Sequence, residues 1–138
     1  MRQEFLMLAD GAEAVAGKVY ILGGGADMHA ASNFPAALKA DIALGFLVAW
    51  SETNQPIQLQ VRVVDADEQE VLVVAAEVVV GRPPSSKPGQ DIRNMVAIKG
   101  PFPIERPGAY KLVMRLDGAD QEPPFRFWVD RSAVSVHG

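Results

Sequence analysis

The fold is decided by residues 107–129, which read PGAYKLVMRLDGADQEPPFRFWV. This stretch contains two runs in which apolar and polar residues alternate, joined by a polar segment rich in turn-forming residues. Because successive side chains of a β-strand point to opposite faces, two such runs predict a β-hairpin. The core-facing residues of this hairpin are expected to be Tyr110, Leu112, Met114, Leu116, Phe125, Phe127 and Val129.

The opposite face of this hairpin has the composition of a binding surface. It carries Lys111, Val113 and Arg115 on the first strand, and Arg126 and Trp128 on the second. Arg and Trp are enriched among the residues that dominate binding free energy at interfaces. We therefore predict that Lys111, Arg115, Arg126 and Trp128 form a docking face for a partner. The alternative is that the arginine stems cover an ordinary surface tryptophan by stacking on it.

Further segments with strand patterns precede the hairpin. Residues 57–65 alternate most regularly, so that strand is expected to have one exposed face. Residues 36–50 fit a helix or a strand by propensity, but the period-2 order of Phe46, Val48 and Trp50 favours a strand from about Asp41. The strands expected before the hairpin are residues 4–9, 18–22, 41–50, 57–65, 71–80 and 91–100.

The segments between these strands are expected to be one helical turn and several loops. Residues 11–16 are predicted to form the helical turn, because Asp10 and Glu13 resemble an acidic capping box and Gly17 is typical of a helix end. Residues 26–35 are predicted to be a loop of mixed composition. Residues 81–90 contain three prolines and are predicted to be an extended loop.

These elements predict an all-β protein. Seven or eight short strands with regularly spaced turns are typical of a two-sheet antiparallel sandwich. The Gly-Ala-Tyr sequence at residues 108–110 also resembles the tyrosine corner of immunoglobulin-like folds. A chain of 138 residues fits one domain, here residues 1–138, with residues 131–138 as a tail that can fray.

The N-terminal part of the chain resembles a known family. Residues 5–25, FLMLADGAEAVAGKVYILGGG, are similar to the opening of small uncharacterised bacterial proteins that share Ala-Asp, a Gly-Lys-[Leu/Val]-Tyr-[Ile/Val] motif and a Gly-Gly-Gly motif. A weaker resemblance extends through residues 48–52, VAWSE, to the C-terminal hairpin, and so covers most of the chain. The resemblance implies an all-β fold, and it brings no assigned activity and no catalytic residue.

Composition excludes several classes of function. The formal charge of −4 and the pI near 5.1 give no cationic field for nucleic acid. The chain has no Cys, which excludes disulfides, thiolate metal sites and cysteine nucleophiles and suits a reducing compartment such as the bacterial cytoplasm. The longest apolar run, residues 42–50, is half a membrane span, and the apolar run at residues 5–9 is too short for a signal peptide. We expect a soluble cytoplasmic protein without a membrane or nucleic-acid partner.

No catalytic motif stands out. The glycines at residues 23–25 follow a strand but fit neither phosphate-binding template, so they are interpreted as a strand exit. Asp27, His29 and Ser32 have the residue types of a hydrolase triad, yet they lie within six residues instead of on separate elements. Both histidines, His29 and His137, are expected to be solvated. We therefore predict no catalytic residue.

Acidic residues at two predicted turns are a candidate for calcium binding, because Ca²⁺ takes carboxylate oxygens from adjacent loops. They are Asp65, Asp67, Glu68, Asp117 and Asp120. The ordered Asp/Asn pattern of a calcium loop is missing, and Asp is a common turn residue. No metal site and no cofactor is predicted.

Residues 71–80 are apolar on both faces apart from Glu77, so both faces of this strand are expected to be covered. Val71, Val73, Ala75 and Val79 are predicted to form a subunit interface of a homo-oligomer, with a two-fold dimer favoured. Otherwise a neighbouring loop or the C-terminal tail covers them.

The sequence leaves two functional hypotheses. The first is a non-enzymatic interaction or structural module that self-associates and offers the Trp128 face to a protein partner. The alternative is a small-molecule or carbohydrate binder, or a hydrolase, that uses residues 23–35. A binder or enzyme requires a concave site with converging polar groups, whereas an interaction module requires an exposed patch.

Overall fold

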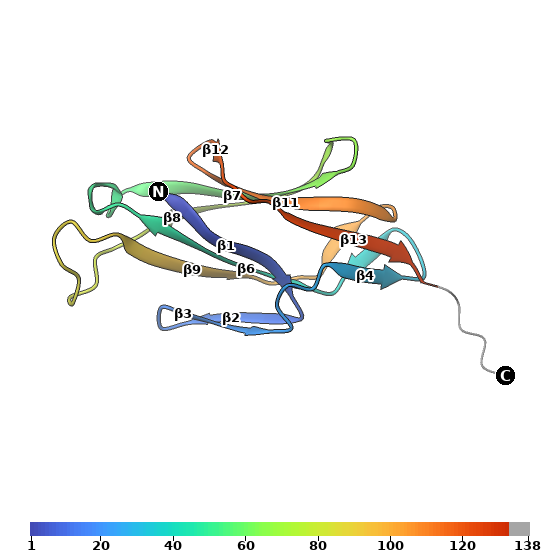
Figure 1. Ribbon diagram of the computed structural model, residues 1–138, viewed down its shortest axis with the longest axis horizontal. Coiled ribbons are helices and arrows are strands. Elements are labelled where there is room, and N and C mark those ends of the chain that lie inside the picture. Colours follow the sequence, from blue (N-terminus) through green and yellow to red (C-terminus); the bar gives the residue numbers. More distant parts are fainter. Residues whose placement is uncertain (133–138) are drawn as a thin grey trace.

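The computed structural model describes residues 1–132 and contains strands and one 3-10 turn, η1 at Trp50–Glu52 (Figure 1). No helix in this part of the chain is long and apolar enough to cross a membrane. The strands are β1 Arg2–Ala9, β2 Gly11–Val15, β3 Lys18–Leu22, β4 Met28–Ala31, β5 Ala36–Leu38, β6 Asp41–Val48, β7 Pro56–Asp65, β8 Glu70–Val79, β9 Ile92–Ile98, β10 Phe102–Ile104, β11 Gly108–Leu116, β12 Ala119–Asp120 and β13 Phe125–Arg131.

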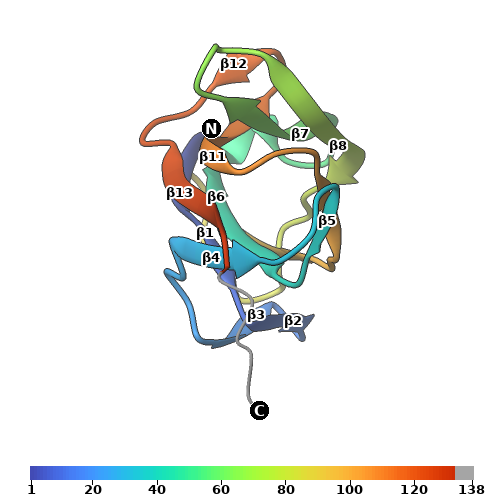
Figure 2. The same cartoon turned by 90° about the vertical axis from the view of Figure 1, so that its right-hand side faces the viewer.

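The strands form a sandwich of two main sheets. The large sheet has the order β4-β13-β11-β7-β8, and the small sheet has the order β1-β6-β9. All neighbours in these sheets are antiparallel except β4 and β13, which are parallel. Figure 2 shows the two layers from one end, with the hairpin of β2 and β3 lying outside the small sheet. The predicted all-β sandwich is confirmed.

The core lies between the two sheets, as the alternation of the strands requires. Phe46 of β6, Ile57 of β7, and Leu112 and Met114 of β11 are essentially inaccessible to solvent. Burying a large apolar side chain stabilises a fold by about 1.5–3 kcal/mol, so the facing sheets are held together mainly by these contacts. Phe127 of β13 completes this layer and stacks on the ring of Tyr110.

The arrangement of strands is immunoglobulin-like. In that fold the first, second and fifth strands share one sheet, and the third, sixth and seventh share the other. Here β1, β6 and β9 form the first group, and β7, β11 and β13 form the second. The Tyr110 hydroxyl donates a hydrogen bond to the carbonyl oxygen of Arg106, four residues upstream. This contact confirms the predicted tyrosine corner.

The C-terminal hairpin has the predicted faces. Strands β11 and β13 pair in a register that places Tyr110 opposite Phe127. Phe127 and Val129 are buried, whereas Trp128 is 39% exposed on the other side. The period-2 pattern therefore gave the correct orientation of Trp128.

The helical turn predicted at residues 11–16 is wrong, because these residues form strand β2 of a hairpin with β3. Ala16 and Gly17 form the turn, with φ angles of 51° and 77°. Positive φ at both central residues is typical of a tight hairpin turn, and Gly17 suits this turn as well as a helix end. The single helical turn of the described chain is η1 instead.

Two other expectations also differ from the structure. Residues 26–35 were expected to be a loop, but they include β4, which is a strand because it pairs with β13. Such pairing overrides the weak strand propensity of Met-His-Ala-Ala. Strand β8 was expected to be covered on both faces, yet Val71, Val73 and Val79 are exposed. The reason is that β8 lies at the margin of the large sheet, where no described element packs on its outward side.

The carboxylate of Asp41 connects strand β6 to the β2–β3 hairpin and to the segment between β9 and β10. Asp41, at the start of β6, accepts hydrogen bonds from the backbone amides of Ala12 (2.9 Å) and Gly100 (3.0 Å) and from the Lys99 ammonium (3.1 Å). Burial raises the pKa of Asp41, but these three donors outweigh it, so the pKa lies below its ordinary value. A side chain at Gly100 would collide with the carbonyl oxygen of Ala40. The hydrogen bonds of Asp41 and the close packing at Gly100 therefore fix how β2 and the segment before β10 lie against the start of β6.

Candidate functional site

The two predicted binding regions share one surface, the outer face of the large sheet, which points away from the small sheet. Val73 of β8 lies opposite Arg62 of β7, which in turn lies opposite Val113 of β11. Lys111 of β11 lies opposite Arg126 of β13. Paired residues project to the same side of a sheet. The sequence could not reveal this common face, because strand order is not encoded in local alternation.

A network of ion pairs occupies the middle of the outer face. Arg62 contacts Asp120 at 2.9 Å and Glu70 at 3.3 Å, and Arg115 contacts Asp120 at 2.7 Å. The hydrogen bond from Arg115 lowers the pKa of Asp120, although burial opposes it. These contacts tie the turn that carries β12 to strand β7. Arg115, one of the predicted docking residues, is therefore already engaged within the chain.

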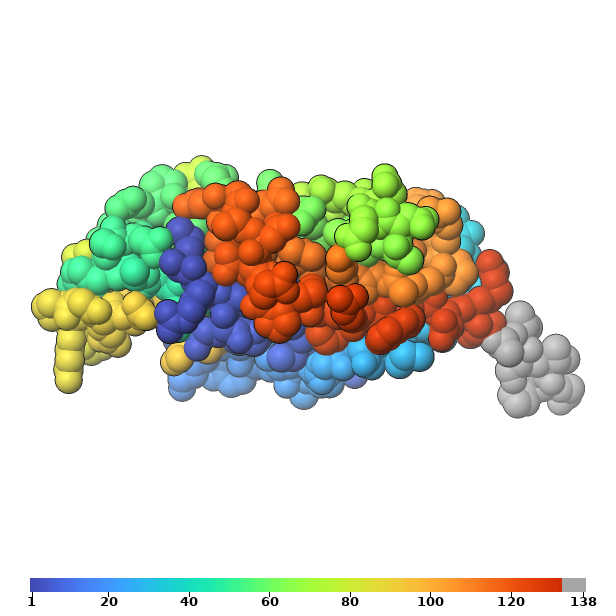
Figure 3. Space-filling view, turned by 45° about the horizontal axis from the view of Figure 1, so that its top comes forward, coloured from blue at the N-terminus to red at the C-terminus, as the bar shows by residue number. Residues whose placement is uncertain are grey.

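A small depression lies beside this network. Figure 3 shows the β7–β8 turn and the β12 segment rising from the outer face, and a hollow of about 150 Å³ is formed between them. Val64 and Val113 are buried at its base, and Lys111 reaches across to Glu68 at 3.0 Å. Lys111 is thus also paired. The charged groups in the middle of the face therefore form ion pairs with one another.

Trp128 forms an apolar patch at one margin of the outer face. It lies opposite Met28 of the parallel strand β4, and Met28 is also exposed. The Trp128 backbone amide donates to the carbonyl oxygen of Asp27. Arg126 lies on the same side of β13, two residues away. The predicted docking face thus contains an exposed apolar pair and Arg126, beside Lys111 and Arg115, which form ion pairs within the chain.

Strand β8 forms the opposite margin of the same sheet. Its ten residues pair only with β7 within the part of the chain that the structure describes. The outward side chains are the predicted interface residues Val71, Val73, Ala75 and Val79, together with Glu77. Leu72, Val74 and Val78 point inward and pack against the core. The strand therefore has one supported face and one apolar exposed face.

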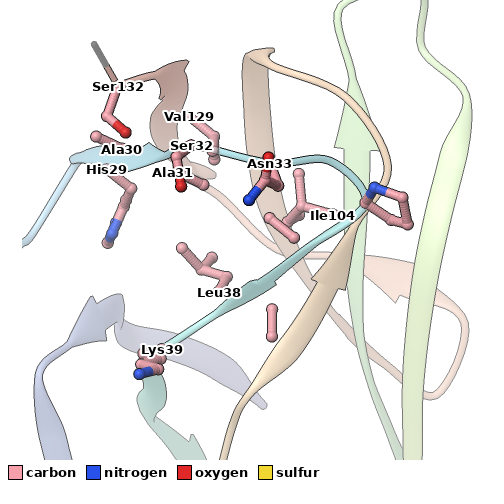
Figure 4. A pocket seen from close by; sticks show the side chains of 13 residues that line it. His29, Ala30, Ala31, Ser32, Asn33, Leu38, Lys39, Ile104, Val129 and Ser132 are labelled. Atoms are coloured by element: carbon pink, nitrogen blue, oxygen red, sulfur yellow. The ribbon is translucent and has the colours of Figure 1, made fainter. Parts of the chain in front are cut away.

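A groove of about 580 Å³ lies at the end of the sandwich, between β4 and β5. Its base consists of Leu38, Ile104 and Val129, which are buried core residues. Figure 4 shows His29 and Lys39 at the wide side, whereas Asn33 lies toward the turn from which the two strands diverge. Sequence analysis missed this groove, because it depends on two strands that do not pair with each other.

The groove does not contain a hydrolase triad. His29 and Ser32 line it, but Asp27 does not, and no Asp or Glu is among the lining residues of the described chain. His29 was expected to be solvated, but it is half-buried, with its ring edge-on to Phe127 and Nε2 bonded to the carbonyl oxygen of Ala26 at 2.8 Å. His137 lies outside the described residues. A general acid or base pair is therefore not assembled here.

The acidic turns do not form a metal cluster within residues 1–132. Asp65 accepts backbone hydrogen bonds from Asp67 and Gln69, which closes the β7–β8 turn. Asp117 likewise accepts from the amide of Gln58. Asp65 therefore serves its own turn, whereas Asp117 ties the end of β11 to the start of β7.

Comparisons with known proteins identify a family but no activity. Residues 4–125 match a family described as a family of unknown function, DUF6941, in agreement with the resemblance seen in the sequence. No curated protein matches the chain. One similar solved structure is a glycosyl hydrolase family 2 member from Bacteroides cellulosilyticus, with 17% sequence identity and a TM-score of 0.34 over 68% of this chain and 14% of that chain. This weak likeness, over a small part of a much longer protein, carries no argument about function.

Proposed function

We propose that this chain, which belongs to DUF6941, a family of unknown function, is a non-enzymatic interaction module that self-associates through strand β8. The observation that supports the proposal is the long margin of the large sheet. Strand β8 has ten residues, one paired edge and an exposed valine-rich face within the described chain. The proposed occupant of its second edge is the β8 strand of another copy.

The argument rests on how proteins treat the edges of sheets. An unpaired strand edge is a template for another chain, and monomeric proteins usually block it with Lys, Pro, a bulge or a covering loop. The interior of β8 contains neither Lys nor Pro, and Glu77 is its only interior charge. The bulge of the β7–β8 pair lies next to the turn, where Val71 has no partner between the pairs Leu72–Val63 and Glu70–Val64, and β8 is regular from Leu72 to Val79. These features favour the pairing of this edge with another strand.

A two-fold axis perpendicular to the sheet allows two copies of β8 to pair antiparallel with their outward faces on the same side. With the axis at Ala75, Val71 lies opposite Val79 of the other copy, and Val73 lies opposite Glu77. Neither Glu70 nor Glu77 then opposes a glutamate, so no like charges meet across the interface. The two large sheets join into one continuous sheet.

Ala75→Lys tests the proposal, because the axis at Ala75 places the two lysines of a dimer directly opposite each other, and like charges across a strand pair are destabilising. By light scattering at tens of micromolar, the wild-type chain should have twice the 14.9 kDa mass, and the variant should be monomeric. Leu22→Lys is the matched control, since Leu22 is an exposed apolar residue on β3, away from the large sheet. A wild-type monomer, or a dimer in both variants, would contradict the proposal.

A protein partner is the second part of the proposal. The support is the exposed Trp128–Met28 pair beside Arg126, because such residues dominate binding at interfaces. Lys111 and Arg115 would contribute by changing ion-pair partners. We place the module in the bacterial cytoplasm, since a chain without cysteine suits a reducing compartment, and its acidic charge disfavours nucleic acid as the partner.

A further inference from the structure

We propose that the groove between β4 and β5 binds an extended peptide segment that carries a carboxylate, either on a side chain or at its C-terminus. This site is separate from the β8 edge and from the Trp128 patch. The bound segment adds a strand at an open edge of the sandwich, so the mode of recognition is β-augmentation.

The first support is the pattern of residues that line the groove. Residues 29–33 and 35–39 line it in unbroken runs. A cavity that touched only one face of a strand would be lined by alternate residues, because successive side chains point to opposite sides. The groove therefore follows the backbone edges of β4 and β5. A ligand in it meets peptide N–H and C=O groups.

The second support is that these edges lack strand partners. Within residues 1–132, β4 pairs only with β13 and β5 pairs only with β10. Strand β1 pairs with β6 only as far as Ala9 opposite Asp41, and the chain then leaves for the β2–β3 hairpin. The position next to β5, in line with β1, is thus open to a strand from another polypeptide.

The third support is the shape and chemistry of the base. Leu38, Ile104 and Val129 are each at most 8% exposed, and they present aliphatic side chains to the groove. An extended segment turns every second side chain toward this base, so it requires apolar residues at alternate positions. The volume of about 580 Å³ suits a segment of about four residues, because strand residues rise about 3.3 Å each and β4 itself has four.

The fourth support, which concerns the carboxylate of the bound segment, is the positive charge around the groove. The groove has Lys39 on its wide side and no acidic lining residue, in a chain whose net charge is −4. Within the described chain Lys39 makes no ion pair. Arg131 lies at the groove margin, with its guanidinium 5.2 Å from the Phe34 ring centre and Nη1 donating to the Ser32 carbonyl oxygen at 3.4 Å. A local excess of cations on an acidic protein favours an anionic segment.

The test uses a library of random hexapeptides with free C-terminal carboxylates, selected on the full-length chain. The counter-selection uses Ala37→Trp, in which a large side chain fills the groove from an exposed position. Enriched peptides are then synthesised, and their dissociation constants are measured by fluorescence anisotropy. Lys39→Glu tests the carboxylate contact, and Lys18→Glu on β3 is the matched control with the same change of charge.

The enriched peptides should have apolar residues at alternate positions and an acidic residue or a required terminal carboxylate. Lys39→Glu should raise the dissociation constants of these peptides by about tenfold or more, whereas Lys18→Glu should change them by less than about twofold. The Ala75→Lys variant should bind the peptides as the wild type does, so the failure of either proposal is distinguishable from the failure of the other. No enrichment, equal binding to Ala37→Trp, or equal weakening by both Lys→Glu changes would overturn the inference.

Discussion

The two edge strands of the large sheet differ in length, in the direction of the neighbouring strand and in charge. Strand β8 has ten residues, an antiparallel neighbour and a mainly apolar outward face whose charged residues are Glu70 and Glu77. Strand β4 has four residues, a parallel neighbour and a groove beside it with Lys39 on its rim. A long regular edge has enough backbone groups to pair with a copy of itself, whereas a short edge above a groove suits a short guest. One sheet therefore offers two kinds of binding edge.

The margins also depend on different parts of the core. Strand β4 is attached to the large sheet only through β13 within the described chain, whereas β8 is attached through β7. Substitutions that destabilise β13 should therefore disturb the groove beside β4 more than the β8 edge. A change at Asp41 should likewise affect the groove side, because Asp41 follows β5 closely in the chain and bonds the amide of Gly100, just before β10, the partner of β5.

The largest expected effect separates the two faces of β13. Phe127→Ala should lower the free energy of unfolding by about 3–5 kcal/mol, because it leaves a cavity in the core. Trp128→Ala should lower it by less than about 1 kcal/mol, since this side chain is on the surface. Thermal and denaturant unfolding of both variants measure the difference. A large loss for Trp128→Ala with little change for Phe127→Ala would show that the hairpin faces are reversed.

Asp41→Asn is expected to have the next largest effect, about 1–3 kcal/mol at pH 7, because backbone amides lose a charged acceptor. The pKa of Asp41 is lowered in the folded state from an ordinary value of 3.8. Its contribution is therefore fully present above pH 3.8 and lost as the pH falls through the folded pKa. Unfolding measured from pH 7 downward should show the difference between wild type and variant shrinking in that acidic range.

Asp130→Asn is the control for this prediction, since Asp130 is exposed on β13. It should leave the stability unchanged within about 0.5 kcal/mol. If the difference between Asp41→Asn and wild type stayed constant at all pH values, the assigned role of this carboxylate would be wrong.

The smallest expected effect concerns the ion pairs between the two margins. Lys111→Met removes the contact with Glu68 at the surface, and exposed pairs contribute about 0–1 kcal/mol. The variant should keep both the dimer and the peptide affinity of the wild type. Denaturant unfolding and light scattering test this together. Loss of the dimer in Lys111→Met would move the interface from the β8 edge to the middle of the outer face.

The sequence predicted those features that depend on local alternation. The inward Phe127, the outward Trp128 and the corner at Tyr110 all follow from period-2 patterns next to turn residues. Strand β4 was missed because a four-residue segment becomes a strand only through its pairing with β13. Residues 11–16 were misassigned because Gly17 fits a hairpin turn as well as a helix end.

The candidate sites show the same limit. The outward valines of β8 could be identified from alternation, but its place at the sheet margin could not, since strand order arises from tertiary pairing. The groove between β4 and β5 could not be predicted from the sequence at all. It exists because β4 and β5 diverge instead of pairing, and no residue pattern marks a pairing that does not form.

The most direct test of self-association through β8 is residue-resolved amide hydrogen exchange by NMR at two protein concentrations. Alternate amides of β8 point toward the second edge, and pairing with another copy should slow their exchange as concentration rises, while amides of β7 stay unchanged. In Ala75→Lys the same β8 amides should exchange rapidly at both concentrations. Exchange rates along β8 that do not depend on concentration in the wild type would contradict the account.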